Sequence, residues 1–188
     1  AYDSPVETEG RAFAIVAPGC MDDMTALPEH YRRRNLKYFF DPGQQTVALS
    51  PEALKAGISG ANILFASDYE LGLIAQKTGW TEDTIMENVA ILVVTLGSKG
   101  SRVRTKEGQV EVPTAKVEKV VDPTGAGDAY RAGFMKGILA GFPLDKCARL
   151  GSVTATYVVE TYGTQNHRFT MDELKARYHT SYGEDLVI

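Results

Sequence analysis

The chain has 188 residues, 44% of them apolar, and a formal net charge of −4. This length suits one domain with a buried core, and the slightly acidic balance lacks the basic footprint expected of a nucleic-acid-binding protein. No run of about 18 apolar residues occurs, so we expect no membrane-spanning helix. The two cysteines, Cys20 and Cys147, exclude a disulfide framework and favour a reducing, cytoplasmic setting.

The first half of the chain alternates short apolar runs with longer amphipathic ones. Residues 1–11 are polar and without a period, which predicts a loop or a severed end. The elements predicted after it are strand 12–17, helix 22–34, strand 36–40, helix 51–56, strand 63–66, helix 69–78, helix 82–88 and strand 89–96. The last strand is almost wholly apolar and β-branched, as strands covered on both faces are. This alternation predicts an α/β fold with a mostly parallel sheet.

The rhythm changes in the second half. Two short strands, 101–105 and 109–113, flank Lys106-Glu107-Gly108 and predict an antiparallel hairpin. Three helices are predicted after it, at 126–140, 144–161 and 171–178. Thr170 and Glu173 form the pattern of a capping box at the start of the last helix.

The segment Asp122-Pro-Thr-Gly-Ala-Gly-Asp128 carries the strongest chemical signal. Small residues at a helix start allow a ligand to approach the backbone, and the free N–H groups of Gly125, Ala126 and Gly127 together with the helix dipole form an anion site. Asp128 lies in the same turn, where the dipole favours its ionised form. An anion site beside a carboxylate base suits phosphoryl transfer to a hydroxyl.

Other phosphate and metal motifs are excluded. The pattern G-x-x-x-x-G-K-[ST] does not occur, and the dinucleotide pattern G-x-G-x-x-G fails because its third glycine is replaced by Tyr130. The chain has no H-E-x-x-H and no zinc-spaced cluster of cysteines and histidines.

The Asp122–Asp128 segment closely resembles the C-terminal signature of the ribokinase-like (PfkB) carbohydrate kinases, whose core reads D-T-x-G-A-G-D. Pro123 replaces the usual threonine, while Thr124 and the four residues after it match. The resemblance implies a three-layer α/β/α fold, ATP and Mg²⁺ as cofactors, the Gly125-Ala126-Gly127 backbone as the anion hole, and Asp128 as the catalytic base. The alternative interpretation is a glycine-rich helix start without chemistry.

Two further segments resemble the same family. Val94-Thr95-Leu96-Gly97-Ser98-Lys99-Gly100 is similar to its nucleotide loop, T-x-G-x-x-G, which implies that Thr95, Gly97, Ser98 and Gly100 bind ATP; the alternative is a strand-ending turn. Ser67-Asp68-Tyr69-Glu70 is similar to its N-x-x-E motif, which implies that Glu70 helps to hold Mg²⁺ through water. Ser67 replaces the asparagine, and a capped helix start explains that residue equally well.

A third similarity concerns a monovalent cation. The family places a loop after its penultimate helix near the purine and the cation. The resemblance implies that Asp122, Thr124 and carbonyls near Gly163 could coordinate K⁺, since hard cations favour oxygen ligands. A glycine at the end of the helix explains Gly163 without an ion.

The similarity covers residues 12–188, the C-terminal, ATP-binding part of the family's domain. The segments 39–44, 68–70 and 163–167 resemble the bacterial adenosine-kinase-like branch, which implies a small-molecule acceptor, a nucleoside or a sugar, with adenosine favoured. The family's first strands, Gly-Gly segment and lid have no counterpart here, so we expect either a fragment or a chain whose first half is missing. Family members commonly form homodimers through that lid.

Two other functions stay open. The chain could be a nucleotide-binding module without catalysis, as Ser67 and the missing lid suggest. Alternatively, it could be a kinase of the same fold that acts on another sugar, a pyrimidine or a vitamin alcohol. Turnover measured with a panel of acceptors distinguishes these hypotheses.

Overall fold

The computed structural model describes residues 13–188, so the end predicted at 1–11 and the first residue of strand 12–17 lie outside it. The chain has two compact units, Ala1–Leu92 and Val93–Ile188. The strands of residues 13–188 belong to one six-stranded sheet whose order follows the chain, β1 to β6. The predicted α/β fold with a mostly parallel sheet flanked by helices is confirmed.

The described part of the first unit contains the first three strands. Its elements are β1 (Phe13–Val16), α1 (Met21–Arg33), β2 (Lys37–Phe40), the 3₁₀ turn η1 (Gly43–Thr46), α2 (Pro51–Ile58), β3 (Ile63–Ser67), α3 (Asp68–Thr78) and α4 (Glu82–Asn88). Strands β1, β2 and β3 pair in parallel, with Phe13 opposite Lys37 and Phe39 opposite Ile63. Strand β3 is buried from Ile63 to Ala66, because α/β sheets are covered by their helices.

Side-chain caps begin helices α2 and α4, whereas α1 begins after Cys20 without one. Ser50 accepts the N–H of Ala53 at the start of α2, and Thr81 accepts the N–H of Thr84 at the start of α4. These hydroxyls satisfy N–H groups that have no partner within the helix.

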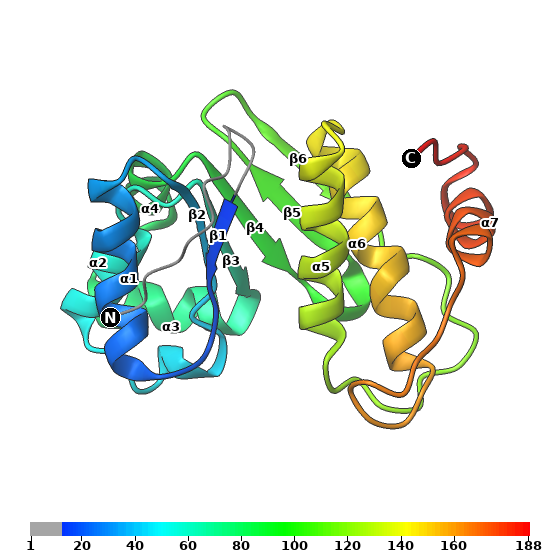
Figure 1. The fold of residues 1–188 in the computed structure, drawn as a ribbon, viewed down its shortest axis with the longest axis horizontal. Helices are drawn as coiled ribbons and strands as arrows, with labels where there is room; N and C mark the ends of the chain where they lie inside the picture. Colours follow the sequence, from blue (N-terminus) through cyan, green and yellow to red (C-terminus); the bar gives the residue numbers. More distant parts are fainter. Residues whose placement is uncertain (1–12) are drawn as a thin grey trace. The chain divides into compact units, whose positions relative to one another are not determined.

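The second unit begins within β4 (Ile91–Thr95), which crosses the boundary. It continues with the 3₁₀ turn η2 (Gly97–Lys99), β5 (Ser101–Arg104), β6 (Gln109–Val112), α5 (Ala126–Leu139), α6 (Leu144–Val159) and α7 (Met171–Tyr182). Strands β5 and β6 form the predicted antiparallel hairpin, with Ser101 opposite Val112. Helices α5 and α6 lie side by side (Figure 1), and α7 packs on α6 through a core cluster that includes Leu150, Leu174 and Tyr178.

The ends of some elements differ from the prediction. Helix α7 runs to Tyr182 instead of 178, because Gly183 adopts a left-handed conformation and ends it there. The strand predicted at 89–96 is shorter, since Val89 still caps α4. Turns η1 and η2 were not predicted, because runs of three or four residues leave no period to detect.

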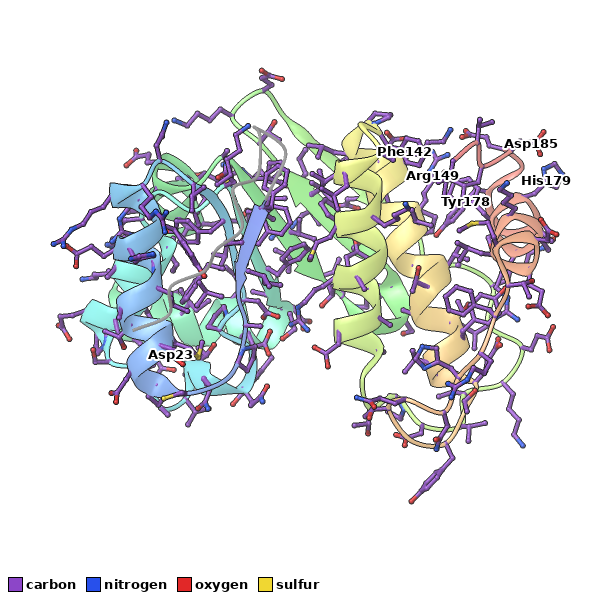
Figure 2. All side chains as sticks on the ribbon, in the orientation of Figure 1. Asp23, Phe142, Arg149, Tyr178, His179 and Asp185 are labelled. Carbon is purple, nitrogen blue, oxygen red and sulfur yellow. The ribbon has the colours of Figure 1, made fainter. Side chains whose placement is uncertain are left out.

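The outer side of α7 carries an exposed side-chain contact. His179 contacts Asp185 at 2.9 Å, on the far side of the helix from Arg149 and Phe142 (Figure 2). None of the described helices is long and apolar enough to cross a membrane.

Candidate active site

Gly125 sets the start of α5. Its φ is +86°, and a Cβ atom there would lie 3.2 Å from the Cβ atom of Thr164. Only glycine adopts this conformation without strain. In the first turn that follows, backbone N–H groups lack partners within the helix. The N–H of Ala126 has a partner outside the helix, because it donates to the Pro123 carbonyl at 3.2 Å. The prediction of three free N–H groups was therefore wrong for Ala126.

Asp128 lies in this first turn and is open to solvent. Its side chain is 82% exposed, and its Oδ1 accepts a hydrogen bond from Nη1 of Arg131 at 3.1 Å. The Arg131 side chain is only 16% exposed, so a largely buried cation one turn along the helix holds the carboxylate. This arrangement presents an accessible, charge-paired carboxylate beside the glycines of the helix start.

A cavity of about 150 Å³ lies against the same helix start. It is lined by Thr95, Gly97, Gly100, Thr114, Ala126, Gly127, Tyr130, Ser152 and Ala155. Two motifs about 30 residues apart in the sequence therefore share one cavity, while Ser98 is not among the lining residues. At Gly100 a Cβ atom would overlap the Val112 carbonyl oxygen, so this glycine lets the hairpin close over the loop.

Four residues of the cavity were missed by the sequence analysis. Tyr130 lies one turn beyond Ala126, and its hydroxyl donates to Oγ of Ser101 at 2.7 Å. Burial raises the pKa of the Tyr130 hydroxyl well above its usual range. Helical spacing could have found Tyr130, whereas Thr114, Ser152 and Ala155 carry no motif.

Asp122 joins the loop before α5 to the loop after α6. Its Oδ1 accepts the N–H of Thr124 at 2.9 Å, and its Oδ2 accepts the N–H of Gly163 at 3.0 Å. Hydrogen bonds from Thr124, and then the one from Gly163, lower the pKa of the Asp122 carboxyl. The three residues predicted near a cation thus come together. Helix α6 ends with Glu160 as its cap, so the alternative that Gly163 ends that helix was wrong.

A sequence model of the pfkB family carbohydrate kinases matches residues 6–170. The chain belongs to the pfkB carbohydrate kinase family. Among curated proteins, this pfkB chain is 42% identical to the nucleoside kinase of Methanocaldococcus jannaschii over 138 residues, which are 73% of this chain and 46% of that protein. The chain spans about half the length of the curated relatives it matches.

Solved structures give the same family. The pfkB chain superposes on the Burkholderia thailandensis nucleoside kinase in complex with inosine with a TM-score of 0.91 and 33% identity, covering 96% of this chain and 59% of that one. For the structure of that kinase in complex with ADP-inosine, the TM-score is 0.91, the identity 34% and the shares covered 95% and 56%.

In this pfkB chain, Glu70 belongs to the first unit and forms a capping box. Its Oε2 accepts the N–H of Ser67 at 2.7 Å, while Ser67 Oγ accepts the N–H of Glu70 at 3.2 Å. The interpretation of Ser67 as a helix cap is confirmed. Within residues 13–188, no group of three or more metal-ligating side chains occurs.

Proposed function

We propose that residues 12–188 form the nucleotide-binding and catalytic part of a kinase that transfers a phosphoryl group from ATP to a hydroxyl of a nucleoside. The observation that carries this proposal is the helix start of α5. There the exposed carboxylate of Asp128 lies in the same turn as Gly127, which lines a cavity shared with the loop 95–100.

In this proposal Asp128 is the catalytic base. An accessible carboxylate can accept the proton of the attacking hydroxyl, and the hydrogen bond from Arg131 orients it. The N–H groups of Gly125 and Gly127 stabilise the charge that develops on the moving phosphoryl group. Ala126 lines the cavity, but its N–H is not assigned to this role because it already donates to Pro123.

ATP binds at this cavity in the proposal. Thr95, Gly97, Gly100 and Gly127 line this cavity. Ser98 and Thr124 lie in the same two sequence segments and are further candidates for contact with ATP. The ADP-inosine complex of the relative from Burkholderia thailandensis supports a nucleotide as the donor.

Oxygen ligands suit the two cations that accompany ATP in this proposal. Mg²⁺ neutralises phosphate charge when bound. Glu70 fits a water-mediated role because its capping bond uses only Oε2. The carbonyls near Gly163 are the candidates for K⁺, with Asp122 holding that loop and Thr124 in place.

The acceptor in this proposal is a nucleoside, with a purine ribonucleoside such as adenosine or inosine favoured. The names of the relatives support this choice, because two of them are nucleoside kinases and one was solved with inosine.

Both cysteines are free thiols, which suits a reducing cytoplasm.

An ADP-release assay tests the proposal on protein expressed from its complete coding sequence. We expect kcat/KM for adenosine or inosine to exceed that for ribose, fructose and pyridoxal by at least about 100-fold, because buried polar groups that recognise a nucleoside are left unpaired by the other acceptors. Preference for ribose, fructose or pyridoxal would refute the nucleoside assignment and leave the kinase assignment standing.

A catalytically inactive, nucleotide-binding protein is the second candidate. The observation that favours it is Ser67, which takes the place of the family's asparagine and is engaged in a helix cap. This candidate predicts that ADP binds in calorimetry while no acceptor in the panel releases ADP. Turnover of a single acceptor rules it out.

A further inference from the structure

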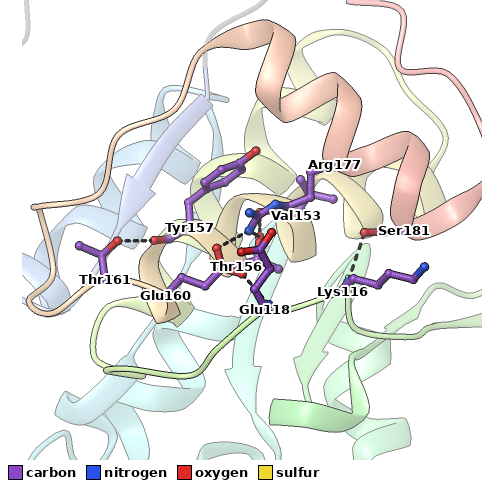
Figure 3. Close-up of polar contacts among 9 residues, drawn as sticks. All are labelled: Lys116, Glu118, Val153, Thr156, Tyr157, Glu160, Thr161, Arg177 and Ser181. Carbon is purple, nitrogen blue, oxygen red and sulfur yellow. Dashed lines mark hydrogen bonds and ion pairs between the residues drawn. The ribbon is translucent and has the colours of Figure 1, made fainter.

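Arg177 of α7 binds side chains at the C-terminal end of α6. Its Nη1 donates to Oε2 of Glu160 at 2.6 Å and to Oγ1 of Thr156 at 2.9 Å, and its guanidinium lies 4.1 Å from the centre of the Tyr157 ring (Figure 3). The side chains of Arg177 and Glu160 are only 18% and 16% exposed. Water therefore competes weakly for this ion pair. The contacts with Glu160, Thr156 and Tyr157 together fix the orientation of the guanidinium.

Glu160 also binds the backbone of the segment that leads into α5. Its second oxygen, Oε1, accepts the N–H of Glu118 at 2.8 Å (Figure 3). The neighbouring carbonyl of Val159 accepts the N–H groups of Val121 and Asp122 at 2.7 and 3.1 Å. The end of α6 thus receives three backbone N–H groups from residues 118–122.

Asp122 carries the connection to the helix start. Its carboxylate binds the N–H groups of Thr124 and Gly163, and Thr124 directly precedes Gly125, the first residue of the predicted anion hole. These hydrogen bonds, together with the backbone between neighbouring residues, therefore connect Arg177 to the turn that contains Asp128.

We propose that Glu160, held by Arg177, is a positioning residue that fixes residues 118–124 and thereby places the α5 start for phosphoryl transfer. The proposal rests on the proposed kinase function for its effect on turnover. Its structural part is independent of that function, because it concerns the hydrogen bonds of Asp122. Lost positioning lowers kcat more than it raises KM, since misplacement of catalytic groups acts on the transition state.

The test compares Arg177→Met with Arg177→Lys and with His179→Ala, which removes an exposed contact on the outer side of the same helix. Amide hydrogen exchange of the Thr124 and Gly163 N–H groups is measured together with kcat and KM. In Arg177→Met we expect both amides to exchange roughly tenfold faster or more, because local opening becomes easier, and kcat to fall roughly tenfold with KM changed less. Arg177→Lys should recover part of both effects, and His179→Ala should match the parent protein.

Exchange at the parent rate in Arg177→Met, or equal changes in His179→Ala, would overturn the proposal. If the parent shows no kinase activity, the proposed function fails while the exchange rates still decide the positioning role. If Arg177→Met does not fold, Glu160→Gln tests the same link, because it keeps the shape and removes the charge that Arg177 binds. Unfolding of both variants would also overturn the proposal, since the pair would then support the unit as a whole.

Discussion

Gly125 has a left-handed backbone conformation and lies at the start of α5, where the proposed anion hole is formed. In Gly125→Ala, the left-handed backbone costs about 1–2 kcal/mol, and the new methyl group presses on Thr164. We expect lower stability in urea unfolding and a Kd for ADP raised roughly tenfold, because the helix start shifts away from the bound phosphates.

Gly141 provides the matched control for this change. Its φ is +75°, but a Cβ atom there would meet nothing within 4 Å. Gly141→Ala should therefore lose similar stability while binding ADP as the parent does. Equal ADP affinity in both variants would contradict the role given to Gly125.

Asp122 gives the stability of the protein a dependence on pH. Its folded pKa lies below the usual value of 3.8, so its hydrogen bonds stabilise the fold fully above about pH 4 and are lost as the pH falls through the lower, folded pKa. Asp122→Asn removes a charged acceptor at all pH values. We expect a lower urea midpoint at neutral pH and a smaller loss of stability on acidification.

The control for this prediction is Asp172→Asn, which changes an exposed acid in the first turn of α7. It measures how far the removal of one carboxylate outside the loop before α5 changes the acid profile. Parallel profiles for the parent and Asp122→Asn would show that Asp122 does not contribute this dependence.

At the scale of elements, glycines bring α5 and α6 close together. A Cβ atom at Gly133 would lie 2.7 Å from the Leu150 carbonyl oxygen and 2.8 Å from the Cα atom of Gly151. Gly133→Ala should destabilise the protein by about 1–3 kcal/mol, because the helices must separate. The measurement is the free energy of unfolding in urea.

Substitution of Gly72, an exposed residue of α3, should change the stability in the opposite direction. Nothing lies within 4 Å of its Cβ position, so Gly72→Ala should stabilise the protein by about 0.5–1 kcal/mol through helix propensity alone. If both variants gained stability, close contact between α5 and α6 would be refuted.

At the scale of the whole molecule, sequence patterns predicted most elements and the helix start of the site. Alternation and caps located the strands and helices, because both depend on neighbouring residues. The motif containing Gly125 and Asp128 could be read for the same reason. The hydrogen bond from Gly163 to Asp122 spans 41 residues, and the one from Arg177 to Glu160 joins two helices, so no local pattern indicates either.

The most direct test of the account compares Asp128→Asn with the parent protein expressed from its complete coding sequence, with ATP and a nucleoside as substrates. The asparagine keeps the shape of the side chain but cannot accept the hydroxyl proton. We predict that kcat falls by about 10²–10⁴-fold while the Kd for ADP changes little, because the base acts only in the chemical step. Turnover by Asp128→Asn close to that of the parent would contradict the assignment of Asp128 as the base.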